Sequence, residues 1–162
     1  MTEQQIRDLE LTARRLRHKI VTMIGPDNPG HLGGSCSIAD ILSVLYFKRM
    51  KHKPSDPKWP QRDRFILSKG HAALGLYAVL SECGYFPEEE LKSIKQLGSI
   101  LKGHPDMLKV PGVEANTGSL GQGLSIACGM ALAARLDKSD HRVYCIMGDG
   151  EIAEGQIWEA SM

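Results

Sequence analysis

Two short apolar runs constrain the fold of this chain more than any other feature, because each leads directly into a polar loop that contains glycine. Residues 65–67 (FIL) run into Ser-Lys-Gly-His, and residues 143–147 (VYCIM) run into Gly-Asp-Gly. Short buried strands that alternate with helical segments are typical of an α/β fold with a parallel sheet. We therefore expect an α/β fold, a parallel sheet flanked by helices. Because such sheets usually have more than two strands, residues 1–162 are expected to form an incomplete domain.

The spacing of apolar residues predicts the helices. Apolar side chains three or four residues apart predict a helix over residues 3–24, with Thr2 and Gln5 as a capping box. A second helix is expected over residues 38–50, capped by Ser37. Further helices are expected over 72–82, after Pro87, from Gly123 to about Leu136 and from near Gly155, with Gly25-Pro26 ending the first helix and loops over 28–34, 51–63 and 98–119.

Composition excludes several classes of protein. Charged residues make up 24% of the chain and the formal net charge is +1, which gives no electrostatic reason to expect a nucleic-acid or membrane partner. No apolar run approaches the roughly 20 residues of a membrane span, and the charged N-terminus is unlike a secretory signal. The four cysteines form no C-x-x-C pair, so we expect reduced, mostly buried thiols in a soluble, cytoplasmic protein.

The Gly-Asp-Gly sequence at 148–150 is the first candidate site. Parallel α/β sheets bind ligands at the carboxyl ends of their strands, which is where this sequence lies. Asp149 offers a hard oxygen ligand of the kind that Mg²⁺ or Ca²⁺ prefers. The flanking glycines allow the backbone to approach an anion closely. The alternative is that these residues only form a tight turn.

The loop at 118–123 (GSLGQG) is the second candidate. It matches neither a dinucleotide-binding fingerprint nor a P-loop, because the glycine spacing differs and no lysine follows. Either it forms a wall of backbone groups against a flat or anionic ligand, or it is simply a helix entry with close backbone packing.

Three histidines in glycine-containing loops are the third candidate. His31, His71 and His104 each follow a glycine, and imidazole can donate to a phosphate or transfer protons near neutral pH. They can also be ordinary loop residues, or the ligands of a zinc ion, although their spacing matches no standard zinc site. The other histidines, at positions 18, 52 and 141, lie among charged residues and are expected on the surface.

Five segments together resemble the transketolase family, in its order and approximate spacing. They are residues 29–35 (PGHLGGS), 67–72 (LSKGHA), 102–106 (KGHPD), 117–123 (TGSLGQG) and 147–155 (MGDGEIAEG). Leu32 in place of proline resembles the N-terminal subunits of split transketolases. The related deoxyxylulose-phosphate synthases typically differ around His71. The resemblance implies a thiamine diphosphate-dependent transferase that moves a two-carbon ketol unit from a ketose phosphate to an aldose phosphate.

The resemblance also implies roles for individual residues. Asp149 would bind the Mg²⁺ or Ca²⁺ that anchors thiamine diphosphate, with the backbone of Gly150 and the side chain of His71 near the diphosphate. Gly118 and Leu120 would line the thiamine rings. The remaining implied catalytic residues are His31 and His104, which would face the sugar donor and assist proton transfer, and Glu154, which would reach across a dimer interface.

Only 12 residues follow Gly150, whereas the family's cofactor motif continues further and includes a second metal ligand. We therefore expect the pyrophosphate-type domain to be cut inside that motif, and the chain to be inactive alone. The expected partners are sugar phosphates and either a second copy of the chain or a C-terminal transketolase subunit. Two alternatives remain: a non-catalytic remnant that pairs with another subunit, and a nucleotide-binding module.

Overall fold

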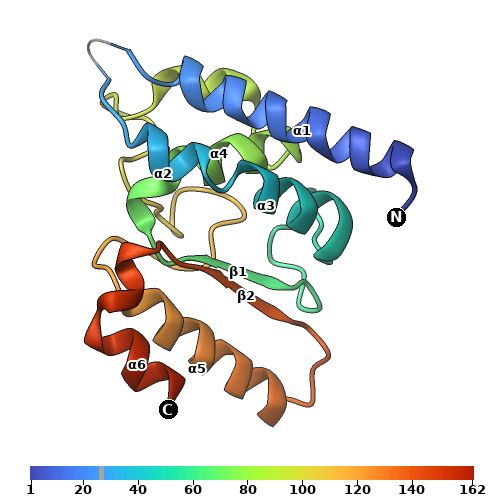
Figure 1. The fold of residues 1–162 in the computed structure, drawn as a ribbon, viewed down its shortest axis with the longest axis vertical. Helices are drawn as coiled ribbons and strands as arrows, with labels where there is room; N and C mark the ends of the chain where they lie inside the picture. Colours follow the sequence, from blue (N-terminus) through green and yellow to red (C-terminus); the bar gives the residue numbers. More distant parts are fainter. Residues whose placement is uncertain (26–27) are drawn as a thin grey trace.

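The computed structural model describes residues 1–25 and 28–162. Two short parallel strands cross the middle of the molecule, with α1 to α4 on one side and α5 and α6 on the other (Figure 1). The elements are α1 (Glu3–Thr22), α2 (Leu32–Cys36), α3 (Ala39–Val44), β1 (Arg64–Leu67), α4 (Ala73–Glu82), α5 (Gln122–Leu136), β2 (Val143–Ile146) and α6 (Gly155–Ser161). This arrangement confirms the predicted α/β class with a parallel sheet.

The register of the two strands brings both glycine-containing loops to one edge of the sheet. Arg64 pairs with Val143 and Leu67 with Ile146. The N–H of Ser68 donates to the carbonyl of Ile146 at 2.8 Å, which continues the ladder for one more residue. The segments that begin at Ser68 and Gly148 therefore leave the sheet side by side, at the edge where parallel sheets bind ligands.

The strand β1 is buried on both faces because helices cover the sheet on each side. Phe65 and Leu67 belong to the core that β1 shares with α1 to α4, and Tyr46 packs edge-on against Phe65. Ile66, which alternates with them, is 1% exposed on the face covered by α5. The helix α4 is buried along nearly its whole length, as expected for a helix that is apolar all round.

The first helix follows its sequence signals closely. Thr2 and Gln5 form the predicted capping box, and Leu16 and Ile20 are fully buried. The helix ends at Thr22, before Gly25, whereas Pro26 lies outside the described residues. No helix in the described part of the chain is both long enough and apolar enough to cross a membrane.

The prediction for residues 28–50 was wrong in two respects. Leu32–Cys36 is the helix α2 rather than a loop, and the single helix expected over 38–50 is split into α3 and a π-helical turn, Leu45–Arg49. Ser37 does not cap α3, because its hydroxyl donates to the carbonyl of Gly34 at 3.0 Å. The chain bends at Ile38, whose side chain is 2% exposed and packs beside Gly75 of α4. The bend at Ile38 separates α2 from α3.

Two smaller predictions also needed correction. The segment after Pro87 is a 3₁₀-helix, Glu88–Ser93, rather than an α-helix. His52 was expected on the surface but is half-buried: it stacks on Tyr85, and its Nε2 lies 2.7 Å from the carbonyl oxygen of Tyr46. The four cysteines are free, as expected, but each is only partly buried.

Candidate active site

A hollow of about 330 Å³ opens at the carboxyl edge of the sheet. Four separate segments line it: α2, the loop after β1, the entry to α5 and the turn after β2. Among its lining residues are four that the sequence singled out, namely His71, Leu120, Asp149 and Gly150. The fold thus brings Gly33 and Gly150, which lie far apart in the chain, into one cavity.

Asp149 is exposed at the rim of this hollow, where a 3₁₀-helical turn begins. Its carboxylate forms no hydrogen bond or ion pair with the described residues, so both oxygens are available to a ligand. Gly150, the next residue, has no atom within 4 Å of the position that a Cβ would occupy. The backbone at Gly150 is therefore open to an incoming anion.

The three predicted histidines lie at or beside the hollow. The rings of His31 and His71 are 5.1 Å apart in an edge-on arrangement. The ring of His104 packs against Gly118, so that a Cβ added there would lie 3.3 Å from His104 Cδ2. Tyr77, which is fully buried, donates its hydroxyl to the carbonyls of Lys102 and His104, both at 3.0 Å, and so holds the loop that carries His104.

The environment of His71 favours its neutral form. Burial lowers the pKa of His71 below its ordinary value, and the neighbouring charges of His31 and Lys69 lower it further. A neutral imidazole retains one donor and one acceptor nitrogen, so it can both bind a polar group and exchange a proton.

The loop that carries Gly118 and Leu120 packs tightly on the end of β1. A Cβ on Gly123 would lie 2.6 Å from the Cα of Ser68, and one on Gly70 would meet the backbone of Thr117 and Gly118. These distances allow only glycine at either position. The structure therefore shows the close backbone packing that was one of the two interpretations of this loop, and the wall against a ligand stays a prediction.

Glu151 is a residue of this site that the sequence analysis missed. Its side chain lines the floor of the hollow and is 2% exposed. Its carboxylate accepts hydrogen bonds from the hydroxyl of Ser68, from Gly121 N–H and from Gly148 N–H. No local signal in the sequence distinguishes Glu151 from the exposed acidic residues.

Lys69 is a second residue that was missed. It is 7% exposed, lines the hollow and forms no ion pair with the described residues. Its Nζ donates only to the hydroxyl of Ser37, at 3.2 Å. Burying a cation without an anion is costly, so the position of Lys69 favours an anionic ligand in the hollow.

Glu154 lies outside the hollow. It is exposed, and a Cβ added at Gly121 would come within 3.0 Å of the Cβ of Glu154. Glu154 therefore stands beside the entry to α5 and does not line the cavity that contains Asp149.

The residues of the hollow fit a diphosphate held with a divalent cation. Asp149 supplies one hard oxygen ligand, Lys69 a buried positive charge and Gly150 an open backbone. The described residues contain no cluster of three or more His, Cys, Asp or Glu side chains that could hold a metal by themselves. The same finding overturns the alternative of a zinc ion held by the three histidines.

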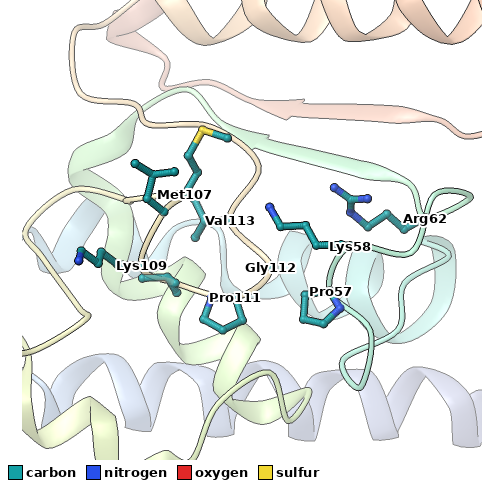
Figure 2. Close-up of a pocket in the computed structure, with 10 residues that line it drawn as sticks. Pro57, Lys58, Arg62, Met107, Lys109, Pro111, Gly112 and Val113 are labelled. Atoms are coloured by element: carbon teal, nitrogen blue, oxygen red, sulfur yellow. The ribbon is translucent and has the colours of Figure 1, made fainter.

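A second hollow, of about 260 Å³, lies between residues 57–62 and residues 107–113 (Figure 2). Its charged residues are Lys58, Arg62 and Lys109, and it is lined by no acid or imidazole. The guanidinium of Arg62 is already engaged by both carboxylate oxygens of Glu114, each at 2.7 Å. This second hollow therefore lacks the acidic and imidazole groups that line the hollow at Asp149.

Comparison with known proteins agrees with this geometry. Residues 10–162 match the family described as transketolase, thiamine diphosphate binding domain. The chain is 50% identical over 162 residues to the 6-deoxy-6-sulfo-D-fructose transketolase subunit SqwG of Clostridium sp. (strain MSTE9), covering all of this chain and 58% of that protein. It is 46% identical over 159 residues to human transketolase, covering 98% of this chain and 25% of that protein.

The fold agrees as well. Transketolase from Leishmania mexicana superimposes with a TM-score of 0.87 at 37% identity, over 94% of this chain and 24% of the solved one. The chain therefore spans little more than half of a transketolase subunit such as SqwG and about a quarter of a full-length transketolase. Its sequence and its fold show that this chain belongs to the transketolase family, within the thiamine diphosphate-binding domain.

Proposed function

We propose that this chain is the N-terminal, cofactor-binding part of a transketolase that transfers a two-carbon ketol unit from a ketose phosphate to an aldose phosphate. The observation that carries the proposal is the hollow in which Asp149, His71 and Leu120, from three separate loops, face one cavity. The relatives are transketolases or subunits of transketolases, which supports the same reaction class.

In this proposal the anionic end of the cofactor lies between Asp149 and Lys69. Asp149 binds Mg²⁺, or Ca²⁺ in its place, and the backbone of Gly150 and the side chains of His71 and Lys69 contact the diphosphate. Gly118 and Leu120 line the rings. Bound thiamine diphosphate supplies the carbanion chemistry of ketol transfer.

Two of the histidines contact the substrate in this proposal, and Glu154 contacts a partner subunit. His31 and His104 bind hydroxyls of the sugar donor and move protons at them, for which imidazole is suited at neutral pH. Glu154, exposed and outside the hollow, extends toward a neighbouring subunit. Because the chain spans only part of its relatives, we propose that the site is completed by a second copy or by a C-terminal transketolase subunit.

A complementation assay tests this function. Mixing the chain with the C-terminal subunit of a split transketolase, Mg²⁺ and thiamine diphosphate should produce ketol transfer between sugar phosphates, with neither component active alone. Ketol transfer should depend on His31. The matched control is therefore the same mixture made with His31→Ala, which should show less transfer. A stable complex without transfer would contradict the proposal and favour the alternative, a non-catalytic pairing module.

The lowered pKa of His71 predicts a pH dependence of stability. The unfolded chain takes up a proton at this position at a higher pH than the folded chain does, so the unfolded state binds more protons as the pH falls through the ordinary histidine value of about 6.5. The free energy of unfolding should therefore decrease as the pH is lowered through this range. Denaturant unfolding at a series of pH values should show that the free energy of unfolding depends less on pH in His71→Gln than in the wild type. An equal pH dependence in the two proteins would contradict the prediction.

A further inference from the structure

The carboxylate of Glu151 joins three segments that come from separate parts of the chain. Its Oε1 accepts from the hydroxyl of Ser68 and from Gly121 N–H at 2.9 Å, and its Oε2 accepts from Gly148 N–H at 2.9 Å. Ser68 follows β1, Gly148 follows β2 and Gly121 precedes α5. One buried side chain therefore ties together the ends of both strands and the entry to the helix that lines the hollow.

The bond to Gly148 closes the turn that carries Asp149. Gly148 and Glu151 are the ends of a four-residue segment, and Asp149 lies inside it. The carbonyl of Asp149 also accepts from Ile152 N–H, which holds the backbone on the other side of the turn. The backbone that carries Asp149 is thus held by bonds that its own side chain does not make.

We propose that Glu151 is a positioning residue, which holds Asp149 and the loop at Gly121 in the arrangement that binds the cation and diphosphate of the proposed function. This inference rests on that function. Ligating carboxylates depend on the groups that orient them, and losing such a partner typically costs roughly tenfold to 100-fold in metal affinity.

Glutamine cannot replace Glu151 without loss. Both carboxylate oxygens accept hydrogen bonds, and two of the three donors are backbone N–H groups, which can only donate. A glutamine side chain has one acceptor oxygen, so its NH₂ group would face a backbone N–H and leave that donor unpaired. Glu151→Gln therefore disturbs the turn while nearly conserving the volume of the side chain.

The opposite edge of the sheet offers a matched control. Asp63 is 4% exposed, and its carboxylate accepts from Lys51 N–H at 2.8 Å and from Arg142 N–H at 2.7 Å. It ties together the segments that precede β1 and β2, as Glu151 ties together those that follow them. Asp63→Asn removes the same kind of buried charge but leaves the hollow intact.

The experiment is a Mn²⁺ titration of the chain mixed with the C-terminal transketolase subunit and thiamine diphosphate, in which paramagnetic broadening of the chain's backbone amide signals is followed. In the wild type, broadening should centre on Asp149 and Gly150, even where binding is weak. Glu151→Gln should shift the midpoint to a roughly tenfold to 100-fold higher Mn²⁺ concentration. Asp63→Asn should leave the midpoint unchanged. Amide exchange at Gly148 and Gly121 should accelerate only in Glu151→Gln.

Each outcome decides the question. Equal Mn²⁺ midpoints in the wild type and Glu151→Gln would overturn the positioning role and leave the proposed function standing. No broadening near Asp149 in the wild type would overturn both. If Glu151→Gln fails to fold, Ser68→Ala removes one of the three donors and keeps the carboxylate. It should shift the Mn²⁺ midpoint to a higher concentration, and an unchanged midpoint would overturn the inference.

Discussion

Asp149→Asn is expected to abolish Mg²⁺-dependent binding of thiamine diphosphate. The substitution keeps the size of the side chain but removes the charge of the one carboxylate that faces the hollow without a protein partner. The loss should be larger than the roughly tenfold to 100-fold expected when a partner of a ligand is disturbed, because here the ligand itself is changed. Isothermal titration with cofactor and Mg²⁺, in the mixture with the C-terminal subunit, measures the effect.

The control for this substitution is Asp140→Asn. Asp140 is also exposed, but it lies before β2, at the other edge of the sheet. Its replacement removes the same charge from the same chain and should leave cofactor affinity unchanged. Equal affinity in Asp149→Asn and the wild type would show that position 149 does not hold the cation.

Among the substitutions that add a single methyl group near the site, Gly70→Ala is expected to lower the free energy of unfolding the most. The new Cβ would lie within 2.8 Å of the backbone nitrogen of Gly118 and closer still to the carbonyl of Thr117. Backbone atoms cannot move aside as a side chain can, so the loop at Thr117 must shift away from β1. We expect a loss of about 3 kcal/mol, or roughly 6–12 °C in Tm, measured by denaturant and thermal unfolding.

The matched control for Gly70→Ala is Gly129→Ala. Gly129 lies inside α5, and a Cβ there would meet nothing within 4 Å. Alanine is favoured over glycine in a helix by about 0.5–1 kcal/mol, so this variant should be slightly more stable than the wild type. If both variants lost stability equally, the close approach between Gly70 and Thr117 would not be the cause.

The parts of the fold that could be predicted are those with a strong local signal. Apolar periodicity and a capping box determine α1 almost to the residue, and two buried apolar runs determine β1 and β2. The parallel direction followed from the alternation of strands and helices. Where a local signal, the expected cap at Ser37, competed with a tertiary contact, the packing of Ile38 against α4, the prediction failed.

The residues of the candidate site also divide into those that a local pattern indicates and those that it does not. A glycine next to a histidine or an aspartate is visible in the sequence, so His31, His71, His104 and Asp149 could be selected in advance. Glu151 and Lys69 could not, because nothing local distinguishes a buried charge from the many exposed ones. Their importance follows from burial and from partners far away in the chain: Ser68 lies 83 residues from Glu151, and Ser37 lies 32 residues from Lys69.

The sequence by itself therefore determined the class of the fold, the family and the loops that carry the chemistry, because short-range periodicity and ordered motifs are local properties. Only the tertiary structure decided which groups face one cavity, which carboxylate is free to bind and which is used to hold the loops together. The physical reason is that the burial of a charge, or the close approach of a glycine to another part of the backbone, depends on atoms from a distant segment of the chain. Those atoms come into contact only when the two strands pair.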